Sequence, residues 1–201
     1  MLISIILFDD FTDLEVFLMW DLLNRVEQRA WKVGLIGERA EQRSRTHITV
    51  SMHAGLDVAA QSNAVLFAGG PGARKKLGDP RFWCAIKLGP ERQLIGSVGR
   101  GSLLLAALGL LAHKRAAAHP SQQDVLQRFG VRGVDEPFVC DGNVATAAGG
   151  LAAQQLVGWA VERLSSQRER ERILGSIQPL ASSMKHAARE RETHVLRRVD
   201  W

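Results

Sequence analysis

Cysteine is scarce in this chain: Cys84 and Cys140 are the only two among 201 residues. Two cysteines so far apart provide neither a disulfide framework nor the close spacing of metal-ligating Cys and His residues. Their scarcity excludes the disulfide-rich secreted class, and a reducing cytoplasm is the expected location. The sequence predicts no metal site and no cofactor.

Long apolar runs and basic blocks are also missing. No apolar run reaches the roughly 18–20 residues that span a bilayer, so we expect no membrane segment. The opening "MLISIILFDD" has no basic region and no small-residue cleavage site, which favours a β-strand over a signal peptide. The net charge is +5, but Lys and Arg alternate with Asp and Glu, a pattern that does not favour nucleic-acid binding.

Apolar runs of strand length alternate with helical segments along the chain. We expect strands at 2–8, 31–37, 64–68 and 92–98, a short edge strand at 47–52, and a hairpin at 137–147 around Asp141-Gly142-Asn143. We expect helices at 12–26, 101–111, 121–129, 150–165 and 167–177. The alternation predicts an α/β fold, with a flavodoxin-like doubly wound, mostly parallel sheet and helices on both faces.

Two of these helices begin with capping-box spacing. Thr12 and Glu15 have this spacing at the start of helix 12–26, and Ser121 and Asp124 have it in helix 121–129. Glu15 therefore has two readings, as a capping residue or as a site residue. The apolar side of the first helix is predicted to consist of Leu14, Phe17, Leu18, Leu22 and Val26.

We expect one domain with an appended helical segment. Residues 1–165 are predicted to form the α/β domain, and residues 166–201 a C-terminal helical extension packed on the same domain. Pro179 is expected to restart the last helix, whose modest apolar face would be Leu180, Met184, Ala188, Val195 and Val199. We expect the extension to act as a solvated cap or as a dimer element.

Three loops that follow strands carry the candidate site. The loops at 9–13, 69–73 and 99–101 should meet at the carboxyl edge of the sheet, where ligands bind in doubly wound folds. Glu15, the turns "GGPG" and "SVGRGS", and His119 in "KRAAAHP" are predicted to converge there. His119 has the alternative reading of an ordinary loop histidine.

The turn at Gly99 has the form of a nucleophile elbow without a nucleophile. Such a strand–turn–helix elbow lifts one side chain over the sheet in a strained conformation, and the helix N-terminus lowers the pKa of a thiol placed there. Gly99 tolerates the strain but has no side chain to react. Ser97 is expected to point into the sheet, Ser102 to cap or pack, and neither cysteine to replace the nucleophile.

Four segments in order, "ILFDDFTDLEVF", "VLFAGGPG", "SVGRGSLLLAALGLLAHKRAAAHP" and "CDGNVATAAGG", resemble the ThiJ/PfpI superfamily, within the class I glutamine amidotransferase-like fold. The resemblance covers about residues 2–165. The most similar branch is that of the isonitrile hydratase-like proteins, which also form the sensor half of AraC-type regulators. The resemblance implies a homodimer.

In that family the elbow reads Ser-Val-Cys-Thr-Gly, with cysteine as the nucleophile. Ser97, Val98 and Gly101 match, whereas the cysteine position falls on Gly99 and the threonine position on Arg100. No cysteine lies between residues 85 and 139, so a shifted alignment supplies none. The resemblance therefore implies a degenerate active site.

The remaining family positions complete the candidate site. The acidic partner falls on Glu15 and the family histidine on His119, while the main-chain oxyanion donors fall on Gly70 and Arg100. The predicted ligand-binding residues are Gly70, Gly72, Gly99, Arg100 and Gly101. Other positions depart from the family pattern: Leu18-Met19 replace Gly-Pro, Pro120 follows the histidine, and Ala153 and Gln155 replace Gly and Asp.

Three functions remain open from the sequence. The first is non-catalytic binding of a small molecule or protein partner. The second is a cysteine-independent hydratase or hydrolase with Glu15 as general base on water. The third is a regulator-derived sensor that has lost its DNA-binding half, because too few residues follow 165 for two helix-turn-helix units. Arg100 lies where a cation opposes the helix dipole, so it is either solvated or placed to meet a small anionic ligand.

Overall fold

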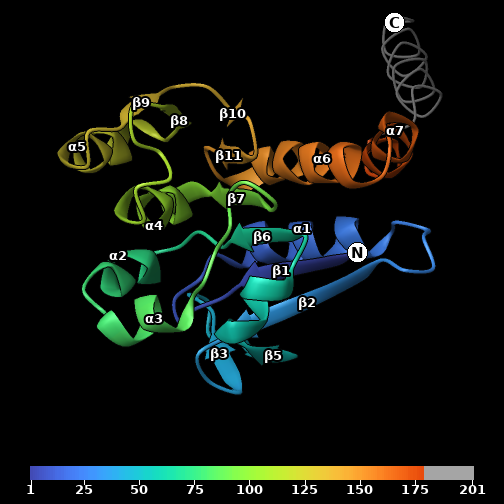
Figure 1. Cartoon of the computed structure of the whole chain (residues 1–201), viewed down its shortest axis with the longest axis horizontal. Coiled ribbons are helices and arrows are strands. Elements are labelled where there is room, and N and C mark those ends of the chain that lie inside the picture. The colour runs from blue at the N-terminus through green and yellow to red at the C-terminus, as the bar shows by residue number, and fades with distance from the viewer. Residues whose placement is uncertain (179–201) are drawn as a thin grey trace, which may run out of the picture.

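The computed structural model describes residues 1–178, which contain a seven-stranded sheet in the order β10-β11-β7-β6-β1-β2-β5 (Figure 1). The strands are β1 (Leu2–Ile6), β2 (Lys32–Gly37), β5 (Ala54–Gly55), β6 (Ala64–Phe67), β7 (Leu94–Val98), β10 (Phe138–Asp141) and β11 (Val144–Ala147). All neighbours in this sheet are parallel except the β10–β11 hairpin. The mostly parallel sheet and the hairpin are confirmed.

Helices lie on both faces of the sheet and confirm the flavodoxin-like α/β class. They are α1 (Asp13–Asn24), α2 (Gly72–Leu77), α3 (Pro80–Ala85), α4 (Ser102–Ala107), α5 (Pro120–Arg128), α6 (Ala153–Leu164) and α7 (Gln167–Gly175). Helices α1 and α6 pack side by side, and α2 packs against α4 (Figure 1). None of the helices within residues 1–178 has the length and hydrophobicity needed to cross a membrane.

Two small ribbons stand beside the main sheet. The predicted edge strand at 47–52 is β4 (Thr49–Ser51), which pairs with β3 (Glu41–Arg43) in an antiparallel hairpin and not with the main sheet. β8 (Arg115–Ala117) pairs with β9 (Arg132–Val134) in parallel. The tip of the β3–β4 hairpin reaches the β1–α1 loop through a bridge between Phe11 and Ser44.

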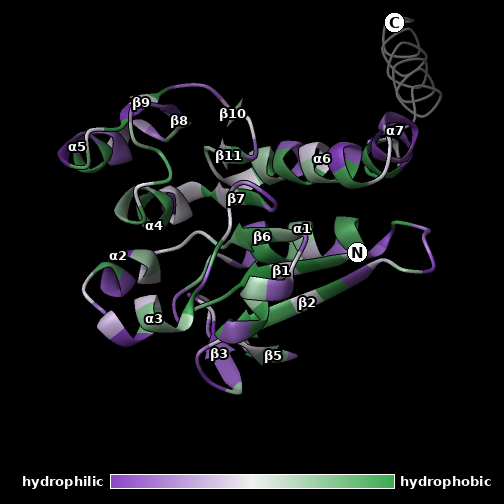
Figure 2. Cartoon of the chain, viewed as in Figure 1, coloured by the Kyte–Doolittle hydropathy of each residue, from purple (hydrophilic) through white to green (hydrophobic). Residues whose placement is uncertain are grey.

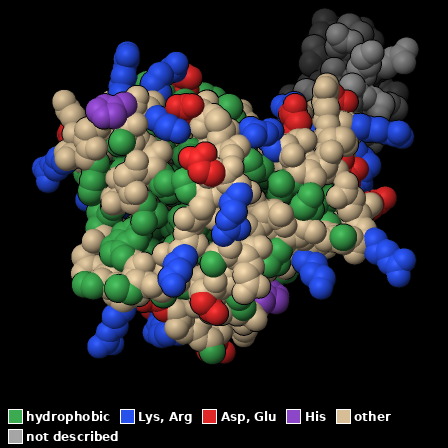
Figure 3. Space-filling model, in the orientation of Figure 1, with side chains coloured by type: hydrophobic (Ala, Val, Ile, Leu, Met, Phe, Trp, Pro, Cys, Tyr) green, Lys and Arg blue, Asp and Glu red, His purple; other side chains and the backbone are tan. Residues whose placement is uncertain are grey.

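The central strands explain why the sheet forms. Every residue of β6 and β7 is buried, as is every residue of β1 after Leu2. Continuous apolar runs of this kind suit parallel strands that are covered on both faces. Figure 2 shows hydrophobic colour over these strands and hydrophilic colour over α5 and α7. On the face seen in Figure 3, Lys and Arg are spread among Asp and Glu.

The predicted apolar side of α1 is wrong at its N-terminal end. Leu14 is 53% exposed and Phe17 is 36% exposed, whereas the buried side contains Glu15 together with Val16, Met19, Leu22 and Leu23. Hydrophobicity alone favoured the stripe through Leu14, because a carboxylate is rarely placed on the core side of a helix. The α1 helix thus carries Glu15 inward, toward the edge of the sheet.

Both predicted capping boxes are also wrong. The Thr12 side chain makes no capping hydrogen bond, and the Thr12 N–H donates to the Gly69 carbonyl at 2.9 Å. At α5 the cap is His119, whose Nδ1 accepts from the Ser121 N–H at 3.2 Å, and Pro120 takes the first helical position. Glu15 is therefore not engaged in a cap, and the capping explanation of this residue is excluded.

The segment predicted as helix 101–111 is shorter than expected. A 3-10 turn at Gly99–Gly101 leads into α4, which ends before Gly109. Gly109 has φ +72°, a left-handed conformation that does not continue an α-helix.

The C-terminal extension begins with α7, which packs against α6 and buries Ile173. The division at residue 165 stays a prediction. The predicted last helix, from Pro179 through Leu180, Met184, Ala188, Val195 and Val199, lies outside the described residues.

Candidate functional site

A pocket of about 440 Å³ lies beside the turn at Gly99, and we call it the elbow pocket. It is formed where the loops after β1, β6 and β7 meet, as the positions of the motifs predicted. Five of the predicted site residues line it: Glu15, Gly70, Gly99, Arg100 and His119. Further lining residues, which the sequence analysis did not single out, include Arg45 and Gln122.

The carboxyl group of Glu15 is enclosed by three glycines from three different loops. A Cβ built on Gly69 would lie 2.1 Å from Glu15 Oε2, and a Cβ on Gly99 or Gly149 would lie 2.8 Å or 2.9 Å from Oε1. Gly99 has φ +53°, in the left-handed region. The Glu15 carboxyl group therefore occupies space that a side chain at position 99 would need.

Glu15 is only 6% exposed, and its two oxygens differ in their contacts. Oε1 accepts from the Gly150 N–H at 3.1 Å, whereas Oε2 is buried without a hydrogen-bond partner among the described residues. Burial raises the pKa of this carboxyl group, although the Gly150 N–H, the charges of Arg100 and Arg45 and the nearby Thr12 hydroxyl act in the opposite direction. The ionised form of Glu15 is thus incompletely compensated.

This imbalance makes stability depend on pH. Folding raises the pKa of Glu15, so the ionised carboxylate destabilises the folded state. This destabilisation is absent below the ordinary pKa of 4.5 and develops as pH rises through the folded-state pKa. Glu15→Gln should raise the free energy of unfolding at pH 7 by about 1 kcal/mol, and this gain should vanish below pH 4.5. Urea unfolding at several pH values measures it, with the exposed Glu41→Gln on β3 as control. An equal effect at every pH would contradict the prediction.

His119 lies in the same pocket but does not contact Glu15 through any hydrogen bond within residues 1–178. Its Nδ1 accepts from the Ser121 N–H at 3.2 Å and lies 2.9 Å from the Ser121 hydroxyl oxygen, so this nitrogen is engaged in the cap of α5. The structure therefore brings the predicted acid and histidine into one pocket without forming a proton relay between them.

The two arginines of the pocket make no direct side-chain contact with an acidic group among the described residues. Neither the Arg45 nor the Arg100 guanidinium makes a hydrogen bond or ion pair with another residue in the described part of the chain. Arg45 comes from the tip of the β3–β4 hairpin, where its N–H donates to the Phe11 carbonyl at 2.9 Å. No motif surrounds Arg45 in the sequence, and only the pairing of distant segments places it here.

Three of the predicted glycines allow neighbouring backbone segments to approach closely. Cβ atoms on Gly70 and Gly72 would lie 2.3 Å from the Asp10 carbonyl oxygen and 1.7 Å from that of Asp9. A Cβ on Gly101 would lie 2.7 Å from the Ala68 carbonyl oxygen. Gly72 and Gly101 are buried and do not line the elbow pocket. Their placement explains why glycine is needed, while a role in ligand binding stays a prediction.

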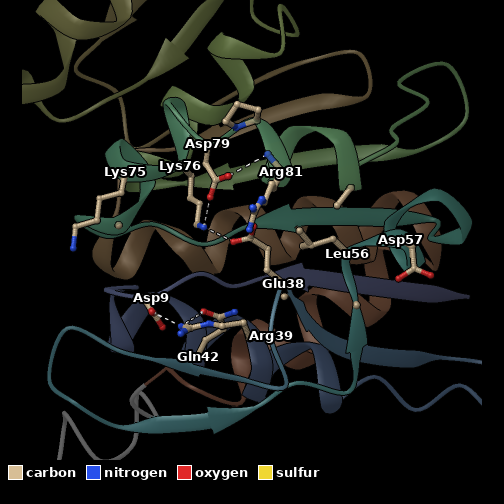
Figure 4. A pocket seen from close by; sticks show the side chains of 15 residues that line it. Asp9, Glu38, Arg39, Gln42, Leu56, Asp57, Lys75, Lys76, Asp79 and Arg81 are labelled. Atoms are coloured by element: carbon tan, nitrogen blue, oxygen red, sulfur yellow. Dashed lines mark hydrogen bonds and ion pairs between the residues drawn. The ribbon is translucent and has the colours of Figure 1, made fainter.

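A larger cleft of about 1160 Å³ is lined by Asp9 and by residues of the β2–β3 turn and of α2 and α3 (Figure 4). Five of its charged side chains pair with one another: Lys76 contacts Glu38 and Asp79, and Arg39 contacts Asp9. Such internal pairing leaves little charge for a ligand to neutralise. The elbow pocket, where charged and polar groups lack partners, is the stronger candidate site.

Other nucleophiles do not replace the missing cysteine. Cys84 on α3 and Cys140 on β10 are exposed, and neither lines the elbow pocket. Ser97 is fully buried in β7, and the Ser102 hydroxyl donates to the Gly99 carbonyl at 2.9 Å. Within residues 1–178, no three His, Cys, Asp or Glu side chains come together in a way that could hold a metal ion.

Known proteins share this fold over most of the described chain. Schizosaccharomyces pombe DJ-1 superposes with a TM-score of 0.76 at 18% identity, covering 89% of this chain and 100% of that one. An AraC family transcriptional regulator from Pseudomonas putida superposes with a TM-score of 0.71 at 18% identity, covering 88% and 99%. At these identities the likeness concerns the fold.

A sequence relative adds a partial match. Isonitrile hydratase from Pseudomonas putida is 40% identical over 76 residues, which are 34% of this chain and 33% of that protein. The match thus spans about a third of the relative's length. The family model of DJ-1/PfpI matches residues 1–163. The elbow and the sheet order agree with this match, and the chain therefore belongs to the DJ-1/PfpI family.

Proposed function

We propose that this protein is a DJ-1/PfpI-family member with a degenerate active site, which binds a small molecule or a partner without cysteine catalysis. The observation that carries the proposal is Gly99 at the apex of the elbow, with the Glu15 carboxyl group beside it in the space of the missing side chain. Without a sulfur at this point no covalent adduct can form there.

The experiment is a turnover assay of the wild type on isonitriles, small aldehydes and activated esters. We expect rates no higher than those of Glu15→Gln, because the variant keeps the shape of the pocket and removes only the titrating group. Turnover by the wild type that Glu15→Gln abolishes would establish the second function instead. Both proteins should be checked for equal folding by circular dichroism before the comparison.

That second function, a cysteine-independent hydratase or hydrolase, has one observation in its favour. Glu15 has a raised pKa and a buried oxygen without a partner among the described residues, and both properties suit a general base that accepts a proton from water. His119, whose Nδ1 is already occupied by the α5 cap, supports it less. The name of the isonitrile hydratase relative suggests the substrates to test first.

A homodimer in the cytoplasm is part of the proposal. Leu14 and Phe17 on α1 and Leu151 in the turn before α6 are exposed apolar side chains on elements that contact each other. Such surfaces often mark protein interfaces. Sedimentation of Leu14→Asp against the wild type tests this role. A regulator-derived sensor stays a third hypothesis, which salt-dependent DNA binding would support.

A further inference from the structure

We infer that the elbow pocket takes a small organic acid, with its carboxylate between Arg45 and Arg100 and a hydrogen-bond donor, a hydroxyl or N–H group, on Gln122 Oε1. A 2-hydroxy or 2-amido acid has this chemistry. The inference rests on the proposed binding function and gives it a ligand class. It is carried by groups in the pocket that lack partners among the described residues.

The anionic end of the ligand follows from the two arginines. Arg45 from the β3–β4 hairpin and Arg100 from the elbow line the same pocket, and both act on Glu15 through their charge. The pocket has two guanidinium groups and only one carboxyl group, which burial makes harder to ionise. Arg100 also opposes the dipole of the helix that it precedes. A bound carboxylate would satisfy both guanidinium groups, for which paired hydrogen bonds are the favoured geometry.

The donor end follows from Gln122. This side chain is 4% exposed, and its Nε2 donates to the Ser121 hydroxyl at 3.2 Å. Oε1 is buried and has no hydrogen-bond partner among the described residues. Buried acceptors of this kind are rare in folded proteins, because each one has lost its bonds to water. A ligand hydroxyl or N–H group would restore one.

The size of the pocket limits the size of the ligand. Its volume of about 440 Å³ is near the lower end of the range for small-molecule sites. Gly99 and Gly149 form the wall beside Glu15 and present no side chain to the ligand. A compact acid fits this space.

Calorimetric titration with butanoate, 2-hydroxybutanoate, 1,2-butanediol and inorganic phosphate tests the inference. The wild type should bind 2-hydroxybutanoate about fivefold more tightly than butanoate and should not bind the diol measurably. Arg45→Gln and Arg100→Gln should each weaken binding of both acids about tenfold. Arg128→Gln removes the same charge at the far end of α5, outside the pocket, and should change nothing.

Gln122→Met tests the donor end. This variant keeps the length of the side chain, and it should remove the preference for 2-hydroxybutanoate while leaving the affinity for butanoate within about twofold. If Gln122→Met fails to fold, Arg45→Gln still decides the anionic end, because Arg45 is exposed. Unchanged binding by Arg45→Gln and Arg100→Gln, or equal binding of the diol and the acids, overturns the inference. Binding of phosphate alone overturns the assignment to carboxylic acids.

The proposed function and the ligand class can fail separately. Turnover by the wild type, together with acid binding that Arg45→Gln weakens, leaves the ligand class intact and replaces binding with catalysis. Absence of turnover, together with no binding of any acid, leaves the degenerate site intact and removes the ligand class. The two assays use the same purified protein, so their results can be compared directly.

Discussion

Replacing Gly99 with cysteine should create a thiol that reacts with iodoacetamide about tenfold faster than Cys84 or Cys140. The new sulfur would lie at the start of the turn into α4, in the pocket that holds Arg45 and Arg100, and positive charge favours the thiolate. A built Cβ lies 2.8 Å from Glu15 Oε1, so the carboxyl group must move to admit it. Mass spectrometry of the labelled peptides gives all three rates in one sample.

The same variant should be less stable than the wild type. Gly99 has φ +53°, and placing a side chain in this region costs about 1–2 kcal/mol. Gly99→Ala carries the same strain without the thiol and serves as the matched control. If the thiol introduced by Gly99→Cys reacts more slowly than that of the exposed Cys84, the elbow does not activate a thiol, and the pocket is not the remnant of a cysteine site.

Gly72→Ala should lower the free energy of unfolding by about 3 kcal/mol. The added Cβ would lie 1.7 Å from the Asp9 carbonyl oxygen and 3.0 Å from Phe8 Cδ2, both parts of the segment that leaves β1. A main-chain oxygen cannot move aside as the end of a flexible side chain can. The β1–α1 loop and the start of α2 would have to separate.

Gly78→Ala is the matched control for this prediction. Gly78 follows α2 with φ −97°, and no heavy atom lies within 4 Å of a Cβ built there. Its replacement should leave stability unchanged or raise it slightly, because alanine restricts the unfolded chain. Urea unfolding of both variants against the wild type measures the difference. Equal midpoints for Gly72→Ala and Gly78→Ala would mean that stability does not depend on the close approach of the β1–α1 loop and the start of α2.

The sequence was sufficient to predict the sheet, but not to predict every side chain that meets in the elbow pocket. Apolar runs such as 64–68 and 92–98 can only be covered on both faces, which made the parallel core predictable. Glu15 and Gly99 could be placed together because each follows a strand of that core. Arg45 could not, since it reaches the pocket through a hairpin whose pairing with Phe11 joins distant parts of the chain.

The burial of polar side chains was the other feature that the sequence did not predict. The predicted stripe through Leu14 and Phe17 contains only apolar residues, yet the structure turns Glu15 inward. A functional site often places a polar group where packing alone would not, and hydrophobic periodicity then fails at that position. Gln122 escaped notice for the same reason, because a buried amide leaves no pattern in the sequence.

The contact between the β3–β4 hairpin and the β1–α1 loop would link occupancy of the pocket to the opening of this hairpin. The Asp10 N–H donates to the Arg43 carbonyl at 2.8 Å, and the Arg45 N–H donates to the Phe11 carbonyl at 2.9 Å. Whenever these bonds open, the pocket loses one of its two guanidinium groups. An acid bound to Arg45 would therefore stabilise the docked position of the hairpin. The amide protons of Asp10 and Arg45 would then exchange more slowly as the pocket fills.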